Sequence, residues 1–337
     1  SDVTEGKPIL IDKFLDNAIE IDVDALSDGK DVYIAGIMEH IEEAGIHSGD
    51  SACVLPTHTL KKEIITQIKK YTIDLAREIN VKGLINIQFA VKDGVVYILE
   101  ANPRASRTVP FVSKAMGIPL AKLASKIMTG KKLSSLIPED LLNGQLKHID
   151  YYCVKEVVLP WIRFSNVDTV LGPEMKSTGE VMGIDKDYGQ AYAKASLAAA
   201  TRFPDKGTVL ISLGERSKSK ALQIARDFIS LGFDILATKH TAEYFIKNQI
   251  AAKEVHKIEE GRPNVTDVIK NKDVCLIINT PSGSKSRKDG YQIRRTAVMH
   301  GVPILTTLAA AVAAVEAIKS RKQMDWSVCP IQEYYKK

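Results

Sequence analysis

The sequence predicts an α+β region built on an antiparallel sheet, followed by an α/β region with a doubly wound parallel sheet. Two observations support this prediction. Through residues 8–102, strand-like segments follow one another with one amphipathic helix between them, whereas short apolar strands alternate with helices after Gly207. Regular strand–helix alternation is typical of a parallel sheet. The change to regular strand–helix alternation predicts a domain boundary near residues 200–207.

The amino-terminal region is expected to consist mainly of strands, with two helices. A turn at "SDGKD" separates the second and third strands, and the helix at 59–80 is indicated by an apolar stripe at helical spacing. The last helix is expected to break near Gly117–Pro119. The predicted strands are Ile9–Phe14, Ala18–Val23, 32–41 (a strand or a strand-to-helix segment), 84–91 and 95–102, and the predicted helices are 59–80 and 111–129.

The middle of the chain is less regular than the part after Gly207. It holds a strand in "YYCVKEVVLPW", a turn-rich stretch in "LGPEMKSTGEVMG", and an alanine-rich helix at about 187–201. The five apolar strands expected after Gly207 are "TVLISL", "FDILAT", "EVHKI", "VCLIIN" and "VPILTT". A helix at 217–231 separates the first two and ends at Gly232.

Bulk composition is that of an ordinary globular protein: 337 residues, 45% hydrophobic and 26% charged. The net charge of +5 is small and the basic residues are dispersed, which argues against nucleic-acid binding. The four cysteines form no CxxC pair and no apolar run reaches membrane-spanning length, so a reduced, cytoplasmic chain without membrane contact is expected. The start, "SDVTEGKPILIDKFL", lacks a methionine and enters a strand-like segment at once, which predicts a piece of a larger protein.

The stretch "YILEANPRAS" carries polar side chains at every second position. Because alternate residues of a strand share a face, Glu100, Asn102 and Arg104 are expected to lie together. Carboxylate and carboxamide oxygens suit Mg²⁺, and an arginine adds a cation for an anion beside the metal. The alternative is a solvated sheet face without a ligand.

The register of the hairpin around "KDG" decides whether Gln88 joins this face. A two-residue loop at Asp93–Gly94 separates Gln88 from Glu100. A three-residue loop ending at Gly94 instead brings Gln88, Glu100 and Asn102 together. The metal-site hypothesis therefore requires the longer loop.

These residues lie in "GLINIQFAVKDGVVYILEANPRASRTVPFVSKAMGIPLAKLA", which resembles the metal-binding core of ATP-grasp enzymes. The closest resemblance is to the second, carboxy-terminal synthetase half of the carbamoyl phosphate synthetase large subunit. The same resemblance to the second synthetase half extends to three other segments, "EIDVDALSDGKDVYIAGIMEHIEEAGIHSGDSACVLP", "KEVVLPW" and "LGPEMKSTGEVMG". The last region resembles the methylglyoxal-synthase-like regulatory domain of that subunit. The resemblance implies a partial ATP-grasp lobe at 1–130, a connecting segment packed on it at 131–203, and a methylglyoxal-synthase-like domain at 204–337.

The resemblance also assigns roles to individual residues. It implies that Gln88, Glu100 and Asn102 hold Mg²⁺ or Mn²⁺ against ATP, that Arg104 faces the reacting phosphoryl group, and that Glu20 receives the ribose hydroxyls. The other nucleotide contacts that it implies are Lys13, Leu15, Ile46, His47 and Ser48. Lys13 departs from an arginine common in the family, and a lysine lacks the bidentate fork. In "GIHSGDS", the glycines allow tight turns and close backbone approach.

The implied reaction is phosphorylation of carbamate by ATP to give carbamoyl phosphate. The implied cofactors are ATP and Mg²⁺ or Mn²⁺, with K⁺ as a further cation. The lobe carrying the glycine-rich lid is expected upstream of Ser1, so the chain alone is expected to lack synthetase activity. The implied partners are the remainder of the large subunit and a glutaminase small subunit, with self-association as a further expectation.

The carboxyl ends of the strands after Gly207 predict an anion site. Ligands of parallel sheets bind at those ends, and helix starts favour anions. Hydroxyl, amide and ammonium groups recur there, although helix capping would explain some of them. The resemblance implies that a nucleotide monophosphate of the UMP or IMP type binds there as an allosteric effector. The residues are Ser212, Lys218, Thr238, Thr241, Lys257 and Asn279. Pro281 replaces a threonine of the family pattern, and "SGSKSRKDG" at 282–290 is expected to be a mobile loop over this site.

A second effector site is implied between the two regions. In arginine-linked relatives, acids matching Glu42, Asp50 and Glu156, with the threonine matching Thr306, bind ornithine. Three carboxylates and a hydroxyl suit an aminium ligand. Three other readings stay open: a nucleotide-sensing module without catalysis, another ATP-grasp ligase such as a biotin carboxylase relative, and a methylglyoxal synthase, for which "ATKHTA" lacks the catalytic acid.

Overall fold

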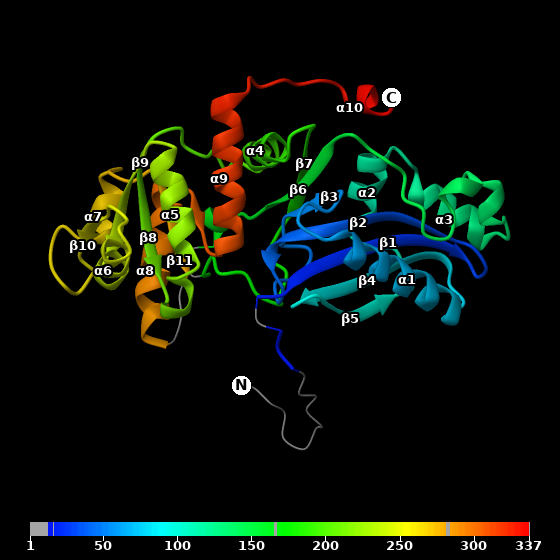
Figure 1. The fold of residues 1–337 in the computed structure, drawn as a ribbon, viewed down its shortest axis with the longest axis horizontal. Coiled ribbons are helices and arrows are strands. Elements are labelled where there is room, and N and C mark those ends of the chain that lie inside the picture. Colours follow the sequence, from blue (N-terminus) through cyan, green and yellow to red (C-terminus); the bar gives the residue numbers. More distant parts are fainter. Residues whose placement is uncertain (1–12, 16, 165–166, 281–283, 337) are drawn as a thin grey trace, which may run out of the picture.

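The computed structural model describes residues 13–15, 17–164, 167–280 and 284–336, with side chains from Asp289 onward in the last range. Two sheets lie side by side, one antiparallel and one parallel (Figure 1). This confirms the predicted fold class. The seven-stranded sheet has the order β5-β4-β1-β2-β3-β6-β7 and all its pairs are antiparallel. Its strands are β1 (Ile19–Asp28), β2 (Val32–Glu43), β3 (Cys53–Leu55), β4 (Lys82–Lys92), β5 (Val95–Asn102), β6 (Tyr152–Val158) and β7 (Gly179–Asp185).

Helix α1 (Lys62–Glu78) covers one face of the antiparallel sheet, as the apolar stripe predicts. Its buried residues Ile64 and Ile68 pack against Ile21 and Val23 of β1. Ile79, which was predicted to belong to the same apolar stripe, is instead the C-cap residue of the helix and is exposed. The sheet face under α1 is therefore apolar, which leaves the opposite face of β1 for polar residues.

The β4–β5 hairpin has a two-residue turn, so the predicted three-residue loop is wrong. Lys92 pairs with Val95, and both turn residues, Asp93 and Gly94, have positive φ, as a type I′ turn requires. A β-bulge at Leu99 then inserts one extra residue into β5. Beyond the bulge, Gln88 pairs with Glu100 and Asn86 pairs with Asn102. The predicted convergence is correct, but the bulge produces it rather than the turn.

Helices α2 (Val109–Met116) and α3 (Leu120–Met128) confirm the helix predicted at 111–129 and its break. Gly117 ends α2 in the left-handed conformation, with φ of 65°, and Pro119 precedes α3. Both helices pack on Leu26 of β1 and Ala35 of β2. The stretch expected to be turn-rich is partly a strand, because its last residues form β7.

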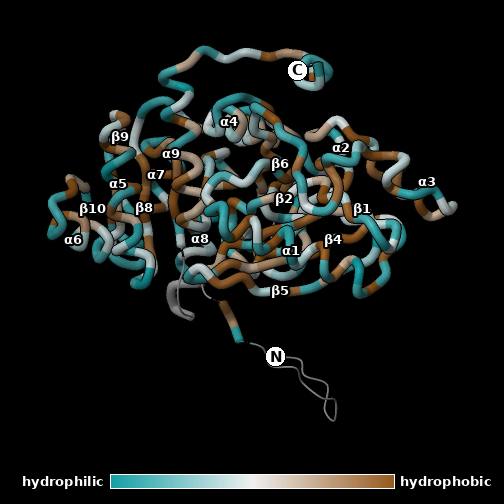
Figure 2. Tube along the Cα trace, turned by 45° about the vertical axis from the view of Figure 1, so that its right-hand side comes forward, coloured by the Kyte–Doolittle hydropathy of each residue, from teal (hydrophilic) through white to brown (hydrophobic). Residues whose placement is uncertain are grey.

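The carboxy-terminal sheet is parallel throughout, with the order β10-β9-β8-β11-β12. Each of the five predicted strands is present, although β10 and β12 are short. The strands are β8 (Gly207–Leu213), β9 (Phe233–Thr238), β10 (Lys253–Val255), β11 (Leu276–Thr280) and β12 (Ile304–Leu305), and the helices are α5 (Ala221–Ser230), α6 (Lys239–Lys247), α7 (Val265–Lys270), α8 (Ser284–His300) and α9 (Leu308–Gln323). In Figure 2, hydrophobic segments follow the strands inside this region, and hydrophilic segments are more common outside.

One apolar core joins the two regions. Helix α4 (Tyr188–Ala198) lies against α9 (Figure 1), and Gly189 approaches Ser320 so closely that a Cβ would lie 2.3 Å from its hydroxyl oxygen. Val154 of β6 and Ile211 of β8 belong to this same core. Beyond α9 the chain crosses to α10 (Ile331–Tyr334), which packs near α2 (Figure 1). The three domain ranges given above stay a prediction.

Two predicted segments differ from the structure. Residues 9–12 of the predicted strand Ile9–Phe14 lie outside the described residues, and Lys13–Leu15 is not a strand. Pro281 also lies outside them, and from Ser284 the predicted loop at 282–290 is the start of α8. Polar composition suggested a loop, but Asp289 and Gly290 belong to a helix that brings them to the end of β11.

Candidate functional site

A cavity of about 380 Å³ opens on the polar face of the antiparallel sheet. It is bounded by β1, β4, β5, β6 and β7, by the loop after β2 and by the loop after β5. The residues that line it are Asp22, His47, Ser48, Gly49, Asn86, Gln88, Glu100, Arg104, Ala105, Ser106, Arg107, Thr108, Lys155 and Glu180. Five of the predicted residues are among them: His47, Ser48, Gln88, Glu100 and Arg104.

The three predicted metal ligands lie next to one another. Asn102 donates its amide N–H to Oε1 of Glu100 over 2.7 Å, and Gln88, opposite Glu100, donates to Oγ of Ser48 over 3.3 Å. One carboxylate and two carboxamides provide only oxygen ligands, which suits Mg²⁺ or Mn²⁺ with further positions for water and phosphate. Within the described ranges no three His, Cys, Asp or Glu side chains form a metal cluster. The donor set therefore fits a hard divalent cation, held by a single carboxylate.

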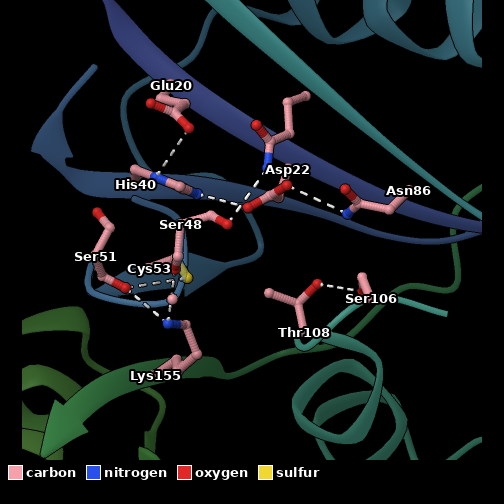
Figure 3. Close-up of polar contacts among 12 residues, drawn as sticks. Glu20, Asp22, His40, Ser48, Ser51, Cys53, Asn86, Ser106, Thr108 and Lys155 are labelled. Atoms are coloured by element: carbon pink, nitrogen blue, oxygen red, sulfur yellow. Dashed lines mark hydrogen bonds and ion pairs between the residues drawn. The ribbon is translucent and has the colours of Figure 1, made fainter. Parts of the chain in front are cut away.

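A row of acids lies beneath this site, and sequence reasoning found only its first member, Glu20, and missed Asp22 and Asp24. Glu20, Asp22 and Asp24 alternate along β1, all three are buried, and they face away from α1. His40 of β2 joins the first two: its Nε2 lies 2.9 Å from Asp22 and its Nδ1 lies 3.9 Å from Glu20 (Figure 3). The period-two pattern in "EIDVD" would have revealed them.

The pKa values of these acids diverge according to their partners. Burial raises the pKa of Glu20, and the neighbouring His40 offsets only part of that effect. Burial also acts to raise the pKa of Asp22, but hydrogen bonds from His40 and Asn86 outweigh it and hold that pKa below its usual value. Asp22 therefore ionises more readily than Glu20.

Asp24 connects the sheet to the loop that carries Arg104. It is fully buried and accepts hydrogen bonds from Ser106 (2.7 Å), Thr108 (2.6 Å) and Asn86 (3.0 Å). Burial raises its pKa to about 6 despite these donors. Asp24 thus holds Ser106 and Thr108, which lie two and four residues after Arg104 in the same loop.

Lys155 of β6 brings a buried ammonium group to the same cavity. It is 1% exposed, and its Nζ donates to the backbone oxygen of Ser51 over 2.7 Å (Figure 3). Its charge also lowers the pKa of Asp22, although less than His40 does. The cavity therefore combines three carboxylates with three cationic side chains, which suits a polyanion bound through a metal. The carboxylates are Asp22, Glu100 and Glu180, and the cations are Arg104, Arg107 and Lys155.

The loop 45–50 is shaped by its glycines, as expected from the sequence. Gly45 has φ of 102°, and its N–H lies 3.4 Å from Glu20. A Cβ at Gly49 would lie 3.0–3.2 Å from Met175, His47 and Arg107. The loop therefore packs against the loop after β5, and Arg107 is a second cationic residue that sequence reasoning missed.

The remaining predicted nucleotide contacts lie outside this cavity lining. Glu20 lies behind it, buried against His40. Leu15 and Ile46 are half-buried, and Lys13 is exposed. Their nucleotide roles stay predictions.

All six residues predicted to bind a nucleotide effector line one cavity of about 170 Å³ in the carboxy-terminal region. Lys218 is buried and pairs with Glu215 at 2.6 Å, while Thr238 and Thr241 lie at the start of α6. The full set is Ser212, Lys218, Thr238, Thr241, Lys257 and Asn279. Two buried hydroxyls at a helix start, with an amide and two ammonium groups from other elements in the same cavity, suit a phosphate group.

A third cavity, of about 550 Å³, lies between the two regions. Glu42, Glu156 and Thr306 line it together, as predicted. Asp50 does not join them, because its two carboxylate oxygens accept the backbone N–H groups of Lys176 (2.7 Å) and Ser177 (2.8 Å). Asp50 belongs to "GIHSGDS", and nothing in that motif indicates that it binds backbone groups more than 120 residues away.

The acids of the third cavity hold their protons tightly. Burial raises the pKa of Glu156 to about 7, and the nearby Glu42 adds to this shift. Burial raises the pKa of Glu42 as well, although Thr307 donates a hydrogen bond to it over 2.6 Å. A cationic ligand would relieve both shifts by stabilising the carboxylate forms.

Comparison with known proteins agrees with this geometry. The family model "Carbamoyl-phosphate synthase L chain, ATP binding domain" matches residues 3–136, and the model "MGS-like domain" matches residues 220–306. The "Carbamoyl phosphate synthase large chain" of Archaeoglobus fulgidus is 59% identical over 335 residues, which cover 99% of this chain. This chain belongs to the family of carbamoyl phosphate synthase large chains.

The match to these large chains is partial in length. The chain spans 31% of the Archaeoglobus relative. It covers 65% of the "Carbamoyl phosphate synthase large chain, C-terminal section" of Aquifex aeolicus, at 52% identity and with 99% of this chain covered. Among solved structures, a "Biotin Carboxylase domain of single-chain bacterial carboxylase" matches 55% of this chain and 48% of its own, at 15% identity and a TM-score of 0.43. Across the described ranges, no helix has the length and apolarity needed to cross a bilayer.

Proposed function

We propose that this chain contributes the metal-bearing wall of an ATP-dependent ligase that phosphorylates carbamate to carbamoyl phosphate. The observation that supports this most is that Gln88, Glu100 and Arg104 line one cavity, and that Asn102 is hydrogen-bonded to Glu100 beside it. The names of the relatives state carbamoyl phosphate synthesis, which supports the proposal, and the phosphorylation of carbamate is our assignment of the step. A biotin carboxylase activity is not favoured, because the carboxy-terminal region matches the MGS-like model.

Positioning and charge neutralisation account for most of the expected catalysis. A carbamate oxygen attacks the γ-phosphorus of ATP while the bond from phosphorus to the ADP oxygen breaks. Gln88, Glu100 and Asn102 would hold Mg²⁺ or Mn²⁺, which supplies charge neutralisation for the phosphates. Arg104 offers its guanidinium to the phosphoryl oxygens that gain charge. A K⁺ ion is proposed as a further cofactor.

The chain alone is expected to form no carbamoyl phosphate. Glu100 and Arg104 are both exposed, whereas phosphoryl transfer requires that water be excluded from the reacting groups. The remainder of the large chain is proposed to close over this wall, and a glutaminase subunit to provide ammonia. Adding the separately expressed remainder to this chain should restore ATP-dependent carbamoyl phosphate formation, measured by conversion to citrulline. Formation by the 337-residue chain alone would contradict the proposal.

We also propose that the second cavity binds a nucleoside monophosphate that controls the enzyme. Replacement of Lys218 by methionine should weaken binding of uridine 5′-monophosphate at least about tenfold, because hydrogen bonds to charged groups contribute roughly 1.5–3 kcal/mol. Titration calorimetry measures this. Lys220→Met is the matched control, since Lys220 contacts Asn17 at the surface. Equal affinity of Lys218→Met and the wild type for uridine 5′-monophosphate would contradict the assignment of this cavity as the nucleotide site.

The third cavity is proposed to bind a basic amino acid such as L-ornithine. The wild-type affinity should rise about tenfold from pH 6 to pH 8, because Glu156, with a pKa of about 7, must lose its proton to pair with an aminium group. Glu156→Gln should flatten this pH dependence. Calorimetry at both pH values measures the change in affinity with pH, and the same change in Glu156→Gln would count against the assignment.

The same raised pKa also affects the stability of the fold. Glu156 stabilises the fold at low pH, and this contribution is lost as the pH rises through 7.

A further inference from the structure

Behind the wall of the second cavity lies a fully buried cation. Arg294 of α8 has 0% exposure, and its NH1 donates to Oδ1 of Asn279 over 2.6 Å. Asn279 lines the cavity and donates in turn to the backbone oxygen of Ser212, another lining residue, over 3.2 Å. Gly290 makes room for this arrangement, since a Cβ there would lie 2.5 Å from NH1 of Arg294.

The partner that neutralises Arg294 comes from the other region of the molecule. Nε and NH2 of Arg294 donate to the two carboxylate oxygens of Asp168, each over 2.6 Å. This is the bidentate pairing in which an arginine fixes both the position and the orientation of a carboxylate. Burial acts to raise the pKa of Asp168, but Arg294 outweighs it and holds that pKa below its usual value. The pair therefore stays ionised, and loss of Asp168 would leave Arg294 as an unpaired buried charge, whereas the Asp168 side chain is 35% exposed.

Asp168 belongs to a segment, residues 167–178, that ends at the first cavity. Near its middle, the oxygen of Gly172 accepts the backbone N–H of His47 over 2.8 Å. Near its end, the N–H groups of residues 176 and 177 bond to Asp50, and Oγ of Ser177 donates to the oxygen of Gly49 over 2.7 Å. The 167–178 segment is thus held at one end by the effector cavity and at the other by loop 47–50.

Loop 47–50 reaches the candidate metal ligands directly. His47, Ser48 and Gly49 line the first cavity, and Ser48 accepts a hydrogen bond from Gln88. A continuous series of hydrogen bonds and one ion pair therefore joins Asn279 to Gln88. Within the 167–178 segment it uses backbone groups of residues 172, 176 and 177 and the side chains of Asp168 and Ser177.

We propose that the Asp168–Arg294 ion pair transmits the occupancy of the nucleotide cavity to loop 47–50, and through it to the phosphoryl-transfer site. The inference rests on the proposed function of both cavities. Among the described residues, Asn279 and Asp168 are the two side chains that accept hydrogen bonds from Arg294, so a ligand that displaces Asn279 alters one of these contacts directly. The resulting movement of Asp168 shifts the 167–178 segment, and the backbone bonds to loop 47–50 shift with it.

Hydrogen exchange of the full 337-residue chain tests this, with uridine 5′-monophosphate as the probe. In the wild type, saturating nucleotide should change the exchange rate of amides in loop 47–50 at least about fivefold, the lower range of allosteric coupling. Asp168→Asn should abolish that change while its nucleotide affinity stays within about twofold, because Asp168 lines neither cavity. Asp205→Asn is the matched control: it breaks a 2.7 Å pair with Arg321 that lies off this route, and the response should persist.

Ser177→Ala supplies a second test at the far end of the segment, in case Asp168→Asn fails to fold. It removes a single hydrogen bond and should also suppress the response in loop 47–50. A full response in either folded variant overturns the inference and leaves the proposed function intact. Nucleotide binding without any response in the wild type overturns the inference too. Absence of nucleotide binding to the wild type overturns both the inference and the proposed effector site.

Discussion

Replacement of Glu100 by glutamine is expected to abolish most metal-dependent phosphoryl transfer by the assembled large chain. Glu100 is the single carboxylate among the three proposed ligands, so the substitution removes the charge that holds the cation. We expect kcat to fall about 10²–10³-fold, the range found when one preorganised transition-state contact is lost. Affinity for Mn²⁺ in the presence of ATP, followed by electron paramagnetic resonance, should weaken at least about tenfold.

Asp93→Asn is the matched control on the same hairpin. Asp93 sits in the turn with φ of 51°, a conformation that asparagine adopts readily, so the fold and kcat should be unchanged. Unaltered Mn²⁺ affinity in Glu100→Gln would rule out the proposed ligand set. A comparable loss in both variants would instead point to disruption of the hairpin.

Replacement of Asp24 by alanine is expected to have the largest combined effect on stability and rate. It leaves Ser106, Thr108 and Asn86 without their buried acceptor, which should lower the free energy of unfolding by about 2–5 kcal/mol. In the assembled enzyme, kcat should fall because the loop that carries Arg104 loses its attachment to the sheet. Urea unfolding and steady-state kinetics measure the two effects.

Two further variants separate positioning from stability. Ser106→Ala combined with Thr108→Val removes the same attachment from the loop side and should reproduce the fall in kcat. Asp28→Ala, on the same strand, removes bonds to the N–H groups of Asp31 and Leu133 and should lower stability while kcat is retained. If kcat instead falls in proportion to stability in all three variants, Asp24 has no positioning role.

The fold was largely predictable because its signals are local. The amphipathic stripe of α1, the strand–helix alternation after Gly207 and the break at Gly117 each depend on neighbouring residues. The β-bulge at Leu99 was not predictable, because nothing in an alternating strand marks which residue lacks a cross-strand partner. Strand alternation and a three-residue hairpin loop predicted the correct cluster of Gln88, Glu100 and Asn102, but the loop has two residues and the bulge brings these side chains together.

Some site residues were predicted correctly and others were missed. The missed residues depend on contacts with residues far away in the sequence. The rim of the parallel sheet places all six nucleotide residues at strand ends or helix starts, so pattern and resemblance agree. Asp22 and Asp24 were missed because buried acids look like surface acids until a histidine or hydroxyl from a distant segment is seen beside them. Asp50 was misplaced for the same reason, since its backbone partners lie 126 and 127 residues away.

The reverse of the proposed reaction tests the central claim most directly. A large chain that contains this segment should form ATP from MgADP and carbamoyl phosphate, because the same groups stabilise the transition state in both directions. We predict that wild-type chain forms ATP, that Asp93→Asn does so at the same rate, and that Glu100→Gln is slower by about 10²-fold or more. Equal rates of ATP formation in the wild type and Glu100→Gln would contradict the assignment of this cavity as a phosphoryl-transfer site.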